Sequence, residues 1–454
     1  MKIVIVGAGE VGYHIASRLA FENKDVVVVD KDPAALRRVA EDMDVQTVDG
    51  SGSSPAVLQE AGIREAEILL AVTDSDETNL VACLVANMLS PSTKKLARLR
   101  GADFDDYYEV FREQAPHIET VINPEIEVVK TIIRLMQVPG AVDVGEFADG
   151  RIKFVGVYLG LDSRLAGAQL NELPEIIGDQ RLLIAAVVRE EEVIIPRGND
   201  RLLTGDLIYF ISEDQHLHAA LSIFDKHVEP VKKVLVIGGG RIGYRLAVQL
   251  EELSIYCKII EKNAERCAAL AERLNKSVVL HGDGSDQNLL SEENVGDMDI
   301  VVTITNDEET NILASLLSRR LGARKTITKI SKFSYFPLMT TIGIEQVVSP
   351  RLSAINTILQ HIRRGKVLSA ISLKGEQAEA MEVVALETSA IVAKPLRRVA
   401  FPKGAIVAGI IRKEQIIIPT GDSVIEPGDR LIIFAQRRAV ERIEKILAVK
   451  LEYF

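Results

Sequence analysis

The sequence has little of what marks disulfide-rich, membrane-spanning or nucleic-acid-binding proteins. Only three of its 454 residues are cysteines, and none lies in a CxxC pair or at a metal-ligand spacing from a histidine. We therefore expect reduced thiols in a cytoplasmic protein, and neither a disulfide framework nor a zinc site. No apolar run approaches the roughly 18 residues of a membrane-spanning helix. The net charge of -11 disfavours a broad basic surface for nucleic acid.

The start of the chain and its composition narrow the class further. Met1 leads directly into an apolar segment, so we expect no secretory signal peptide. Hydrophobic residues make up 47% and charged residues 26% of the sequence, as in ordinary soluble globular proteins. The length is enough for about three or four domains. A protein of this kind that works at a membrane would do so from the cytoplasmic side, through a partner.

A glycine-rich turn follows the first apolar segment. We predict a buried strand at Ile3–Val6. It is followed by Gly7, Gly9 and Gly12, and a second apolar run ends in Asp30. This order of strand, turn, helix, strand and acid is the dinucleotide-binding fingerprint. Its glycines permit the turn, let the backbone approach a pyrophosphate and allow close helix–strand packing. The phosphates would lie on the N–H groups of the helix N-terminus, and the acid would accept hydrogen bonds from ribose hydroxyls.

Two polar loops follow later strands of the same predicted sheet. Asp49–Ser53 comes after a short strand, and Thr73 with Asp74 and Asp76 comes after the apolar run that begins at Ile68. Alternating strands and helices predict a parallel, doubly wound sheet, in which ligands bind outside the carboxyl ends of the strands. We therefore expect both loops to line an adenosine pocket, with ordinary polar loops as the alternative. The acids of the second loop are interpreted as a helix N-terminus rather than a cation site.

The same landmarks return in the second half of the chain. Gly7 and Gly238 are 231 residues apart, and Thr73 and Thr305 are 232 residues apart. Landmarks of several kinds that stay in register to one residue indicate an internal duplication.

A smaller module follows each glycine-rich copy. It reads as short apolar strands with a short helix at 165–173, and its turn at Gly205 and Asp206 recurs at Gly428 and Asp429. We therefore predict an α/β protein with two Rossmann-like, doubly wound parallel-sheet domains, each followed by a small α+β domain. The predicted domains are a first nucleotide-binding domain at 1–138, a first small domain at 139–228, a second nucleotide-binding domain at 229–365 and a second small domain at 366–454.

Each predicted nucleotide-binding domain ends in a helix with an apolar stripe, at 124–136 and at 350–362. Such a stripe packs either on its own domain or on a partner, and the residues alone favour neither arrangement.

The residues predicted to hold a nucleotide come from equivalent loops of the two copies. Asp30 favours NAD over NADP, although Lys31 beside it weakens that preference. Glu10 places a carboxylate near the expected phosphates, whereas Arg241 in the second copy would neutralise one, so we expect the two sites to prefer different ligands. In the first copy the predicted residues are Gly7, Ala8, Gly9, Glu10, Val11, Gly12, Asp30, Lys31, Asp49, Gly50, Ser51, Thr73, Asp74 and Asn79. In the second copy they are Gly238, Gly240, Arg241, Ile242, Gly243, Glu261, Gly282, Asp283, Thr305 and Asn306.

The sequence predicts neither a catalytic residue nor a metal site. No histidine, lysine or tyrosine stands out as the acid or base of a hydride transfer, and no substrate domain of dehydrogenase size follows either fingerprint. We therefore predict a nucleotide sensor, with an NAD-dependent oxidoreductase as the alternative. A redox-sensing DNA-binding repressor would need a helix-turn-helix with a basic recognition helix, and the sequence shows none.

This ordered and duplicated set of motifs resembles the TrkA family, the nucleotide-binding peripheral subunits of bacterial and archaeal Trk potassium uptake systems. The repeating unit of that family is the RCK (KTN) module, for regulator of potassium conductance. The resemblance covers essentially the whole chain. It rests on segments 6–12, 28–30, 49–51, 73–79 and 122–125, and on the turns at 205–206 and 428–429. The second copy departs from the pattern at Gly239, Arg241, Glu261 and His281, which leaves its ligand open.

The resemblance implies a cytoplasmic protein, peripheral on the inner face of the cell membrane and docked on an integral membrane potassium-translocating subunit of the Trk type. It implies NAD(H), or ATP/ADP, as ligands that bias a ring-like homo-oligomer between conformations that open or close the pore. It also implies that the helices at 124–136 and 350–362 are crossover segments that reach a partner subunit. No nucleic acid partner is expected.

Overall fold

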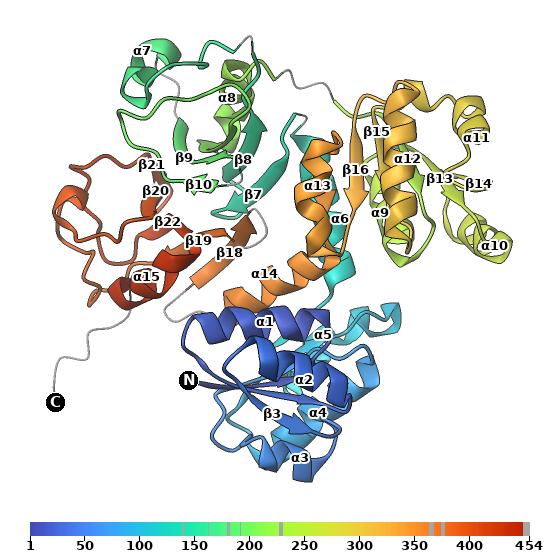
Figure 1. The fold of residues 1–454 in the computed structure, drawn as a ribbon, viewed down its shortest axis with the longest axis vertical. Helices are drawn as coiled ribbons and strands as arrows, with labels where there is room; N and C mark the ends of the chain where they lie inside the picture. Colours follow the sequence, from blue (N-terminus) through green and yellow to red (C-terminus); the bar gives the residue numbers. More distant parts are fainter. Residues whose placement is uncertain are drawn as a thin grey trace. The chain divides into compact units, whose positions relative to one another are not determined.

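The computed structural model describes residues 1–138, 140–161, 163–178, 182–190, 192–226, 230–362, 367–373 and 377–447. These residues form two six-stranded and two five-stranded sheets, which Figure 1 shows with their helices. Contacts divide the chain into two compact units. The first unit is Met1–Glu127 with Pro350–Ile362, and the second is Val128–Ser349 with Arg363–Phe454.

A six-stranded parallel sheet forms the centre of the first unit, with the strand order β3-β2-β1-β4-β5-β6. This is the doubly wound order that the fingerprint predicts. Because helices cover both faces, the central strands are apolar throughout, and Ile3, Val4 and Ile5 have no exposed surface. The strands are β1 Lys2–Val6, β2 Asp25–Asp30, β3 Gln46–Asp49, β4 Ile68–Ala71, β5 Lys94–Arg98 and β6 Thr120–Ile122. The helices are α1 Glu10–Phe21, α2 Pro33–Asp42, α3 Pro55–Glu60, α4 Asp76–Leu89, α5 Tyr108–Glu113 and α14 Pro350–Ile362.

The second unit contains the duplicate sheet, ordered β14-β13-β12-β15-β16-β17. Its register repeats that of the first sheet, because Ile3 pairs with Val26 and Val234 pairs with Cys257. The strands are β12 Lys233–Ile237, β13 Tyr256–Glu261, β14 Val278–His281, β15 Ile300–Thr303, β16 Thr326–Lys329 and β17 Gln346–Val348. The helices are α9 Arg241–Glu252, α10 Ala264–Arg273, α11 Gln287–Glu292, α12 Glu308–Arg320 and α13 Phe336–Thr341.

Two antiparallel five-stranded sheets complete the second unit, with the orders β10-β9-β11-β8-β7 and β18-β19-β22-β20-β21. They share an apolar core in which the ring of Phe154 stacks on Tyr209 and on Phe434. The elements of the first are β7 Asp143–Phe147, β8 Ile152–Tyr158, α7 Leu173–Ile177, β9 Leu182–Arg189, β10 Glu192–Ile194, β11 Leu207–Glu213 and α8 Leu217–Ile223. The elements of the second are β18 Val367–Leu373, β19 Ala378–Val384, β20 Ala405–Arg412, β21 Gln415–Ile417, β22 Arg430–Gln436 and α15 Val440–Leu447.

The acidic residue of the recurring Gly-Asp turn has the same partner in both small sheets. Arg189 donates to Asp206 at 2.8 Å, and Arg412 donates to Asp429 at 3.0 Å. Both aspartates are 2% exposed, so each is a buried carboxylate that needs its arginine. The turn therefore fixes the small sheets.

Helix α14 follows the second six-stranded sheet in the sequence but packs in the first unit, against α1 and β6 (Figure 1). Its apolar stripe, which includes Ile355, Ile358 and Leu359, is buried there. In α6 (Pro124–Gln137), by contrast, the residues from Val128 onward belong to a core of the second unit. The helix at 350–362 therefore crosses over, and in this chain it reaches the other half of the same chain.

The structure differs from the sequence-based expectation in several local elements. The helix predicted at 165–173 is wrong in position, because residues 170–172 form a 3-10 turn and α7 follows it. Leu165 is fully buried in an earlier turn, so its apolar character reflects core packing and not a helix face. The short edge strands β6 and β17 and the strands β7, β18 and β19 were not predicted.

The predicted domain boundaries remain predictions. Pro139, Glu229 and residues 363–366, on which they depend, lie outside the described residues. Among the residues that the structure does describe, no helix is long and apolar enough to cross a bilayer.

Candidate functional site

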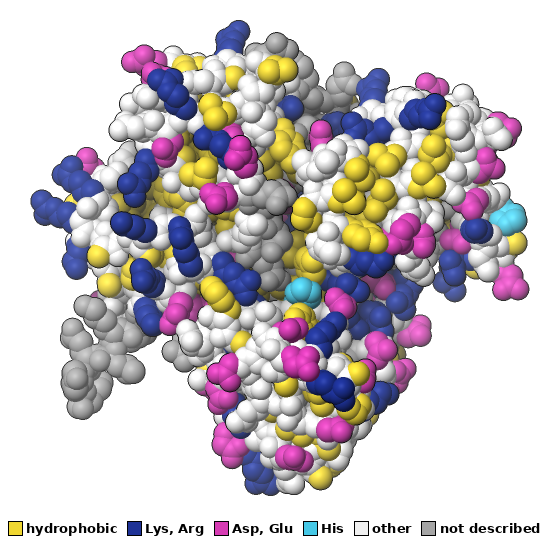
Figure 2. All heavy atoms as spheres, in the orientation of Figure 1, with side chains coloured by type: hydrophobic (Ala, Val, Ile, Leu, Met, Phe, Trp, Pro, Cys, Tyr) yellow, Lys and Arg dark blue, Asp and Glu magenta, His cyan; other side chains and the backbone are white. Residues whose placement is uncertain are grey.

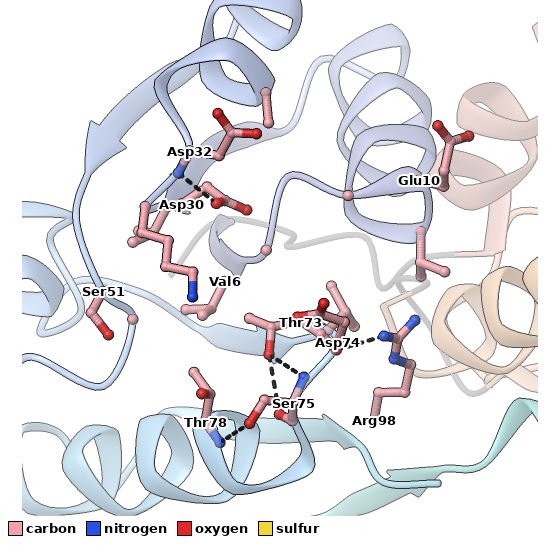
Figure 3. Close-up of a pocket in the computed structure, with 18 of the residues that line it drawn as sticks. Val6, Glu10, Asp30, Asp32, Ser51, Thr73, Asp74, Ser75, Thr78 and Arg98 are labelled. Atoms are coloured by element: carbon pink, nitrogen blue, oxygen red, sulfur yellow. Dashed lines mark hydrogen bonds between the residues drawn. The ribbon is translucent and has the colours of Figure 1, made fainter.

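A cavity of about 480 Å³ opens at the carboxyl ends of the central strands of the first repeat. Its walls come from the glycine-rich turn after β1, the end of β2, and the loops that follow β3 and β4. Figure 3 shows Asp30 and Asp32 on one side of this cavity, with Glu10 and Arg98 on the other. Its volume and position are those of a small-molecule site in a doubly wound fold.

The three glycines of the turn have different physical roles. Gly7 has a φ of 112°, and a Cβ on it would lie 2.9 Å from the backbone nitrogen of Thr73. A Cβ on Gly12 would lie 1.8 Å from the carbonyl oxygen of Gly7, so helix α1 could not approach β1. A Cβ on Gly9 would meet no protein atom within 4 Å. The fold therefore requires glycine at the first and third positions, whereas the second leaves open space beside the helix N-terminus.

Asp30 ties the end of β2 to this turn. Its Oδ2 accepts a hydrogen bond from the backbone N–H of Ala8 at 2.5 Å, and its Oδ1 accepts one from the N–H of Asp32 at 2.9 Å. Each carboxylate oxygen has a second lone pair. Asp30 can therefore hold the turn and still accept a hydrogen bond from a hydroxyl in the cavity.

A buried asparagine braces the loop that follows β4. Asn79, which has no exposed surface, accepts from the N–H and from the hydroxyl of Thr73, and its amide donates to the carbonyl oxygens of Thr73 and Arg98. Arg98 also donates to the carbonyl oxygen of Thr73 at 2.6 Å. Burial, helped by nearby Arg100, lowers the pKa of Arg98 to about 10, so its guanidinium still carries a charge at neutral pH. Asn79 thus holds Thr73 at the cavity without lining it, whereas Arg98 both holds the loop and lines the cavity.

Glu10, the first residue of α1, is paired with two arginines. Its Oε1 lies 3.4 Å from Nη1 of Arg38, and its Oε2 lies 3.2 Å from Nη1 of Arg351. Arg351 is the second residue of α14, so the second half of the chain supplies a cation to the wall of this cavity. The carboxylate that seemed unfavourable for phosphate binding is thus largely balanced.

Ten of the fourteen residues predicted for the first site line the cavity: Gly7, Gly9, Glu10, Val11, Asp30, Lys31, Gly50, Ser51, Thr73 and Asp74. Ala8, Gly12, Asp49 and Asn79 are not in its wall. Sequence reasoning missed the lining residues Val6, Val29, Asp32, Ala35, Val72, Ser75, Thr78, Arg98 and Arg351. Ser75 and Thr78 could have been found from the predicted N-terminus of α4, but no local pattern points to Arg351.

The glycine-rich turn of the second repeat has the same geometry. Gly238 has a φ of 115°, a Cβ on Gly243 would lie 2.0 Å from the carbonyl oxygen of Gly238, and one on Gly240 would meet nothing within 4 Å. Asn311 holds Thr305 as Asn79 holds Thr73, with bonds of 2.8 Å to its N–H and hydroxyl. The duplication thus preserves the framework of the site.

The acid at the end of β13 is used differently from Asp30. Glu261 is 6% exposed and accepts from the backbone N–H groups of Gly239 and Asn263, both at 2.8 Å, and lies 3.3 Å from Arg266. Burial alone would raise the pKa of Glu261, but these hydrogen bonds and the arginine charge lower it. The longer side chain turns inward. Three donors of the protein bind its two carboxylate oxygens, which leaves them fewer lone pairs for a ligand than Asp30 has.

The remaining residues predicted for the second site lie on the turn, on α9 and on the loops that follow β14 and β15. Lys262 and Asp283 form an ion pair at 2.8 Å between the ends of β13 and β14. This pair lowers the pKa of Asp283 to about 2. Arg241 and Ile242 begin α9, Gly282 precedes Asp283, and Asn306 is exposed after Thr305.

The acidic clusters after β4 and β15 anchor loops. Asp76 accepts from the backbone N–H groups of Arg100 and Gly101, and Glu308 accepts from those of Ser331 and Lys332. Asp307 caps α12 through the N–H of Thr310. Within the described ranges, no group of three or more His, Cys, Asp or Glu side chains is arranged to hold a metal ion.

Two protein-family models each match the chain twice, in alternating order. The TrkA-N domain model matches residues 3–124 and 234–350, and the TrkA-C domain model matches residues 154–225 and 380–448. Relatives match along their whole length. The Trk system potassium uptake protein TrkA of Azorhizobium caulinodans is 37% identical over 458 residues, covering 100% of both chains, and that of Vibrio alginolyticus is 34% identical over 451 residues, covering 98% of both.

Among solved structures, the GsuK RCK domain resembles this chain with a TM-score of 0.60 at 18% identity, covering 98% of this chain and 94% of that one. A structure described as the GsuK channel bound to NAD has the same score and identity and covers 98% of this chain and 78% of that one. These likenesses establish the fold. The family models and the full-length relatives go further, and together they show that the chain belongs to the TrkA family of the Trk potassium uptake system, whose members are regulatory subunits and not enzymes.

Proposed function

We propose that the first repeat binds NAD(H), and that the bound nucleotide regulates a potassium-translocating membrane subunit of the Trk type. The observation that carries this proposal is the open space at Gly9. No protein atom lies within 4 Å of a Cβ built there, so the protein itself does not require glycine at this position. A pyrophosphate that approaches the backbone would require it.

The rest of the cavity fits the same ligand. Helix α1 begins at Glu10 after Gly9, and no side chain caps it, so its first N–H groups are available to an anion. Asp30 keeps lone pairs for ribose hydroxyls, and the hydroxyls of Ser51 and Thr73 lie in the wall. The structural neighbour described as NAD-bound supports the choice of ligand, with ATP/ADP as the alternative nucleotide for this site.

The second repeat is proposed to bind a nucleotide with a different preference. Glu261 is buried and accepts hydrogen bonds from Gly239, Asn263 and Arg266, so it has fewer lone pairs left for ribose hydroxyls than Asp30 has. Arg241 stands where the first repeat has Glu10, and a cation there favours a more highly charged phosphate group. This arrangement supports ATP/ADP, rather than NAD(H), as the ligand of the second repeat.

The proposed assembly is a ring-like homo-oligomer on the inner face of the cell membrane, docked on the integral membrane subunit. A nucleotide can shift such a ring between conformations only by its difference in affinity for them. Membership of the Trk system supports the partner, and the duplicated fold provides two ligand sites in each chain.

A substitution at Gly9 tests the proposal without disturbing the fold. The Cβ of Gly9→Asp meets no protein atom within 4 Å, and its carboxylate repels a phosphate at the turn. We expect NADH affinity to fall at least about tenfold in calorimetric titration, and potassium uptake with a co-expressed Trk-type membrane subunit to lose its dependence on nucleotide.

Gly160→Asp is the matched control, because a Cβ on Gly160 also meets nothing within 4 Å and Gly160 does not line the cavity. Unchanged NADH binding and uptake in Gly9→Asp combined with Gly240→Asp would refute the nucleotide mechanism.

A further inference from the structure

Acidic side chains outnumber basic ones in the wall of the first cavity. Its charged lining residues are Glu10, Asp30, Lys31, Asp32, Asp74, Arg98 and Arg351, four acids and three bases. A nucleotide would add further negative charge to this set. The helix N-terminus contributes only a partial positive charge, so a full cation close to the phosphates would strengthen binding substantially.

Two of the three cations have positions that suit other tasks. Arg98 donates to the carbonyl oxygen of Thr73 at 2.6 Å, which fixes the loop after β4. Lys31 directly follows Asp30 at the end of β2, on the side where a ribose would lie. Arg351 is different, because its partner Glu10 is the first residue of α1. Arg351 thus lines the cavity and pairs with the first residue of the helix whose N-terminus would hold the phosphates.

A bound phosphate could replace Glu10 as the partner of Arg351, because the ion pair between them is partly exposed. The side chains of Glu10 and Arg351 are 42% and 29% exposed, and Nη1 of Arg351 lies 3.2 Å from Oε2 of Glu10. An ion pair this exposed contributes little to stability, whereas hydrogen bonds between an arginine and a phosphate are charge-assisted and stronger. A phosphate can thus replace the carboxylate as the partner of Arg351 at little cost. Arg38, at 3.4 Å from Glu10, remains to balance the released carboxylate.

We infer that Arg351, supplied by the second half of the chain, is a phosphate-binding residue of the first site, and that Glu10 sets the preference of that site for a pyrophosphate over a triphosphate. This inference rests on the proposed nucleotide site and specifies how it selects its ligand. Glu10 stays close to the bound phosphates. Its repulsion grows with the negative charge of the ligand, so it penalises ATP more than NADH.

The test uses the full chain in a Gly240→Asp background, so that titration reports on the first site. NADH, ATP and adenosine are titrated calorimetrically into the parent and into Arg351→Gln. We expect affinity for NADH to fall about tenfold, because a charge-assisted hydrogen bond is lost, and affinity for adenosine to stay unchanged. The salt dependence of NADH binding should weaken in the same variant.

Arg38→Gln is the matched control. Arg38 pairs with the same carboxylate as Arg351 but is not in the cavity wall. We expect a change in NADH affinity of less than about twofold for this variant, because only a surface ion pair is lost. Equal effects of Arg351→Gln and Arg38→Gln would overturn the role of Arg351.

Glu10→Gln tests the second part and leaves both arginines in place. We expect ATP affinity to rise about three- to tenfold and NADH affinity to rise less, because a like charge is removed beside the phosphates. If Arg351→Gln does not fold, this variant decides the inference alone, and an unchanged ratio of ATP to NADH affinity overturns it. Failure of the parent to bind any of the three ligands would instead refute the proposed function itself.

Discussion

The carboxylate of Asp30 accepts a hydrogen bond from the backbone N–H of Ala8 at 2.5 Å, and so joins the acid of the fingerprint directly to its glycine-rich turn. Asp30→Ala should therefore have two effects. It should lower NADH affinity at the first site about tenfold or more, and it should lower the free energy of unfolding by about 1–3 kcal/mol, because a charged acceptor of two N–H groups is lost.

Calorimetric titration and urea denaturation measure these two effects separately. Asp30→Asn is the control, since its side-chain oxygen can still accept one of the two backbone hydrogen bonds. If the alanine variant lost stability but bound NADH normally, the acid would serve the turn alone.

The buried asparagines Asn79 and Asn311 should be equally important in the two repeats. Each accepts from the N–H and hydroxyl of the threonine six residues earlier, Thr73 or Thr305, and donates to two carbonyl oxygens. Asn79→Ala and Asn311→Ala leave these groups without partners in a buried place, which should cost about 2–4 kcal/mol of unfolding free energy each. Urea unfolding of the single variants measures this. A cost below about 0.5 kcal/mol, typical of an exposed position, would contradict the bracing role.

The two small sheets are joined by a buried carboxylate. Glu382 is 2% exposed; its Oε1 lies 2.5 Å from Nε of Arg430, and its Oε2 accepts from the N–H of Ala148 at 3.1 Å. Arg430→Ala should cost about 2–4 kcal/mol in urea denaturation, because it leaves a buried charge without its partner. Asp422→Ala is the contrasting variant, since Asp422 and its partner Arg397 are both well exposed. It should cost no more than about 0.5 kcal/mol, and an equal cost for the two variants would refute the argument.

Stability of the second repeat should fall in acid through Glu251, at the end of α9. Burial alone would raise the pKa of this carboxylate, but hydrogen bonds from Lys276, Ser277 and Asn275 lower it from 4.5 to about 2. Because the folded-state pKa lies below the unfolded one, the stabilisation is complete above the unfolded pKa. It is lost as the pH falls from about 4.5 toward 2.

Glu251→Gln should therefore be less stable than the parent at neutral pH and should lose less stability between pH 5 and pH 2. Unfolding free energies measured across this range provide the check. Parallel curves for the two proteins would show that another group is responsible.

The doubly wound sheets could be predicted because their information is local. Apolar runs such as Ile3–Val6, followed by glycines at fixed spacing, have few alternative structures. The duplication added a second, independent reading of the same pattern. The three-residue edge strand Thr120–Ile122 could not be found, because so short a segment has no period of its own. The small sheets were harder for a related reason, since Leu165 and Leu173 are apolar at a spacing that a helix and a packed loop share.

In the candidate site too, residues placed by local sequence patterns could be predicted, and residues placed by long-range packing could not. The turn, Asp30 and the loop at Thr73 follow strands, so their place at one sheet edge follows from the topology. Two features did not follow. Glu261 turns inward and accepts hydrogen bonds from Gly239 and Arg266. This arrangement depends on the extra methylene that glutamate has relative to aspartate and on the neighbouring Arg266. Arg351 reaches the cavity only because α14 packs on α1, a contact between residues more than 300 positions apart in the sequence.

The position of α14 also bears on how the gene can be divided. A gene cut between the two repeats would encode the first sheet without the helix that covers α1 and β6, and would leave Thr120 without His361. The two repeats are therefore not interchangeable fragments, although each carries a complete set of motifs. A peptide that spans residues 350–362, supplied separately, should complement an isolated first half. The first half of the chain therefore depends on a helix that only the second half supplies.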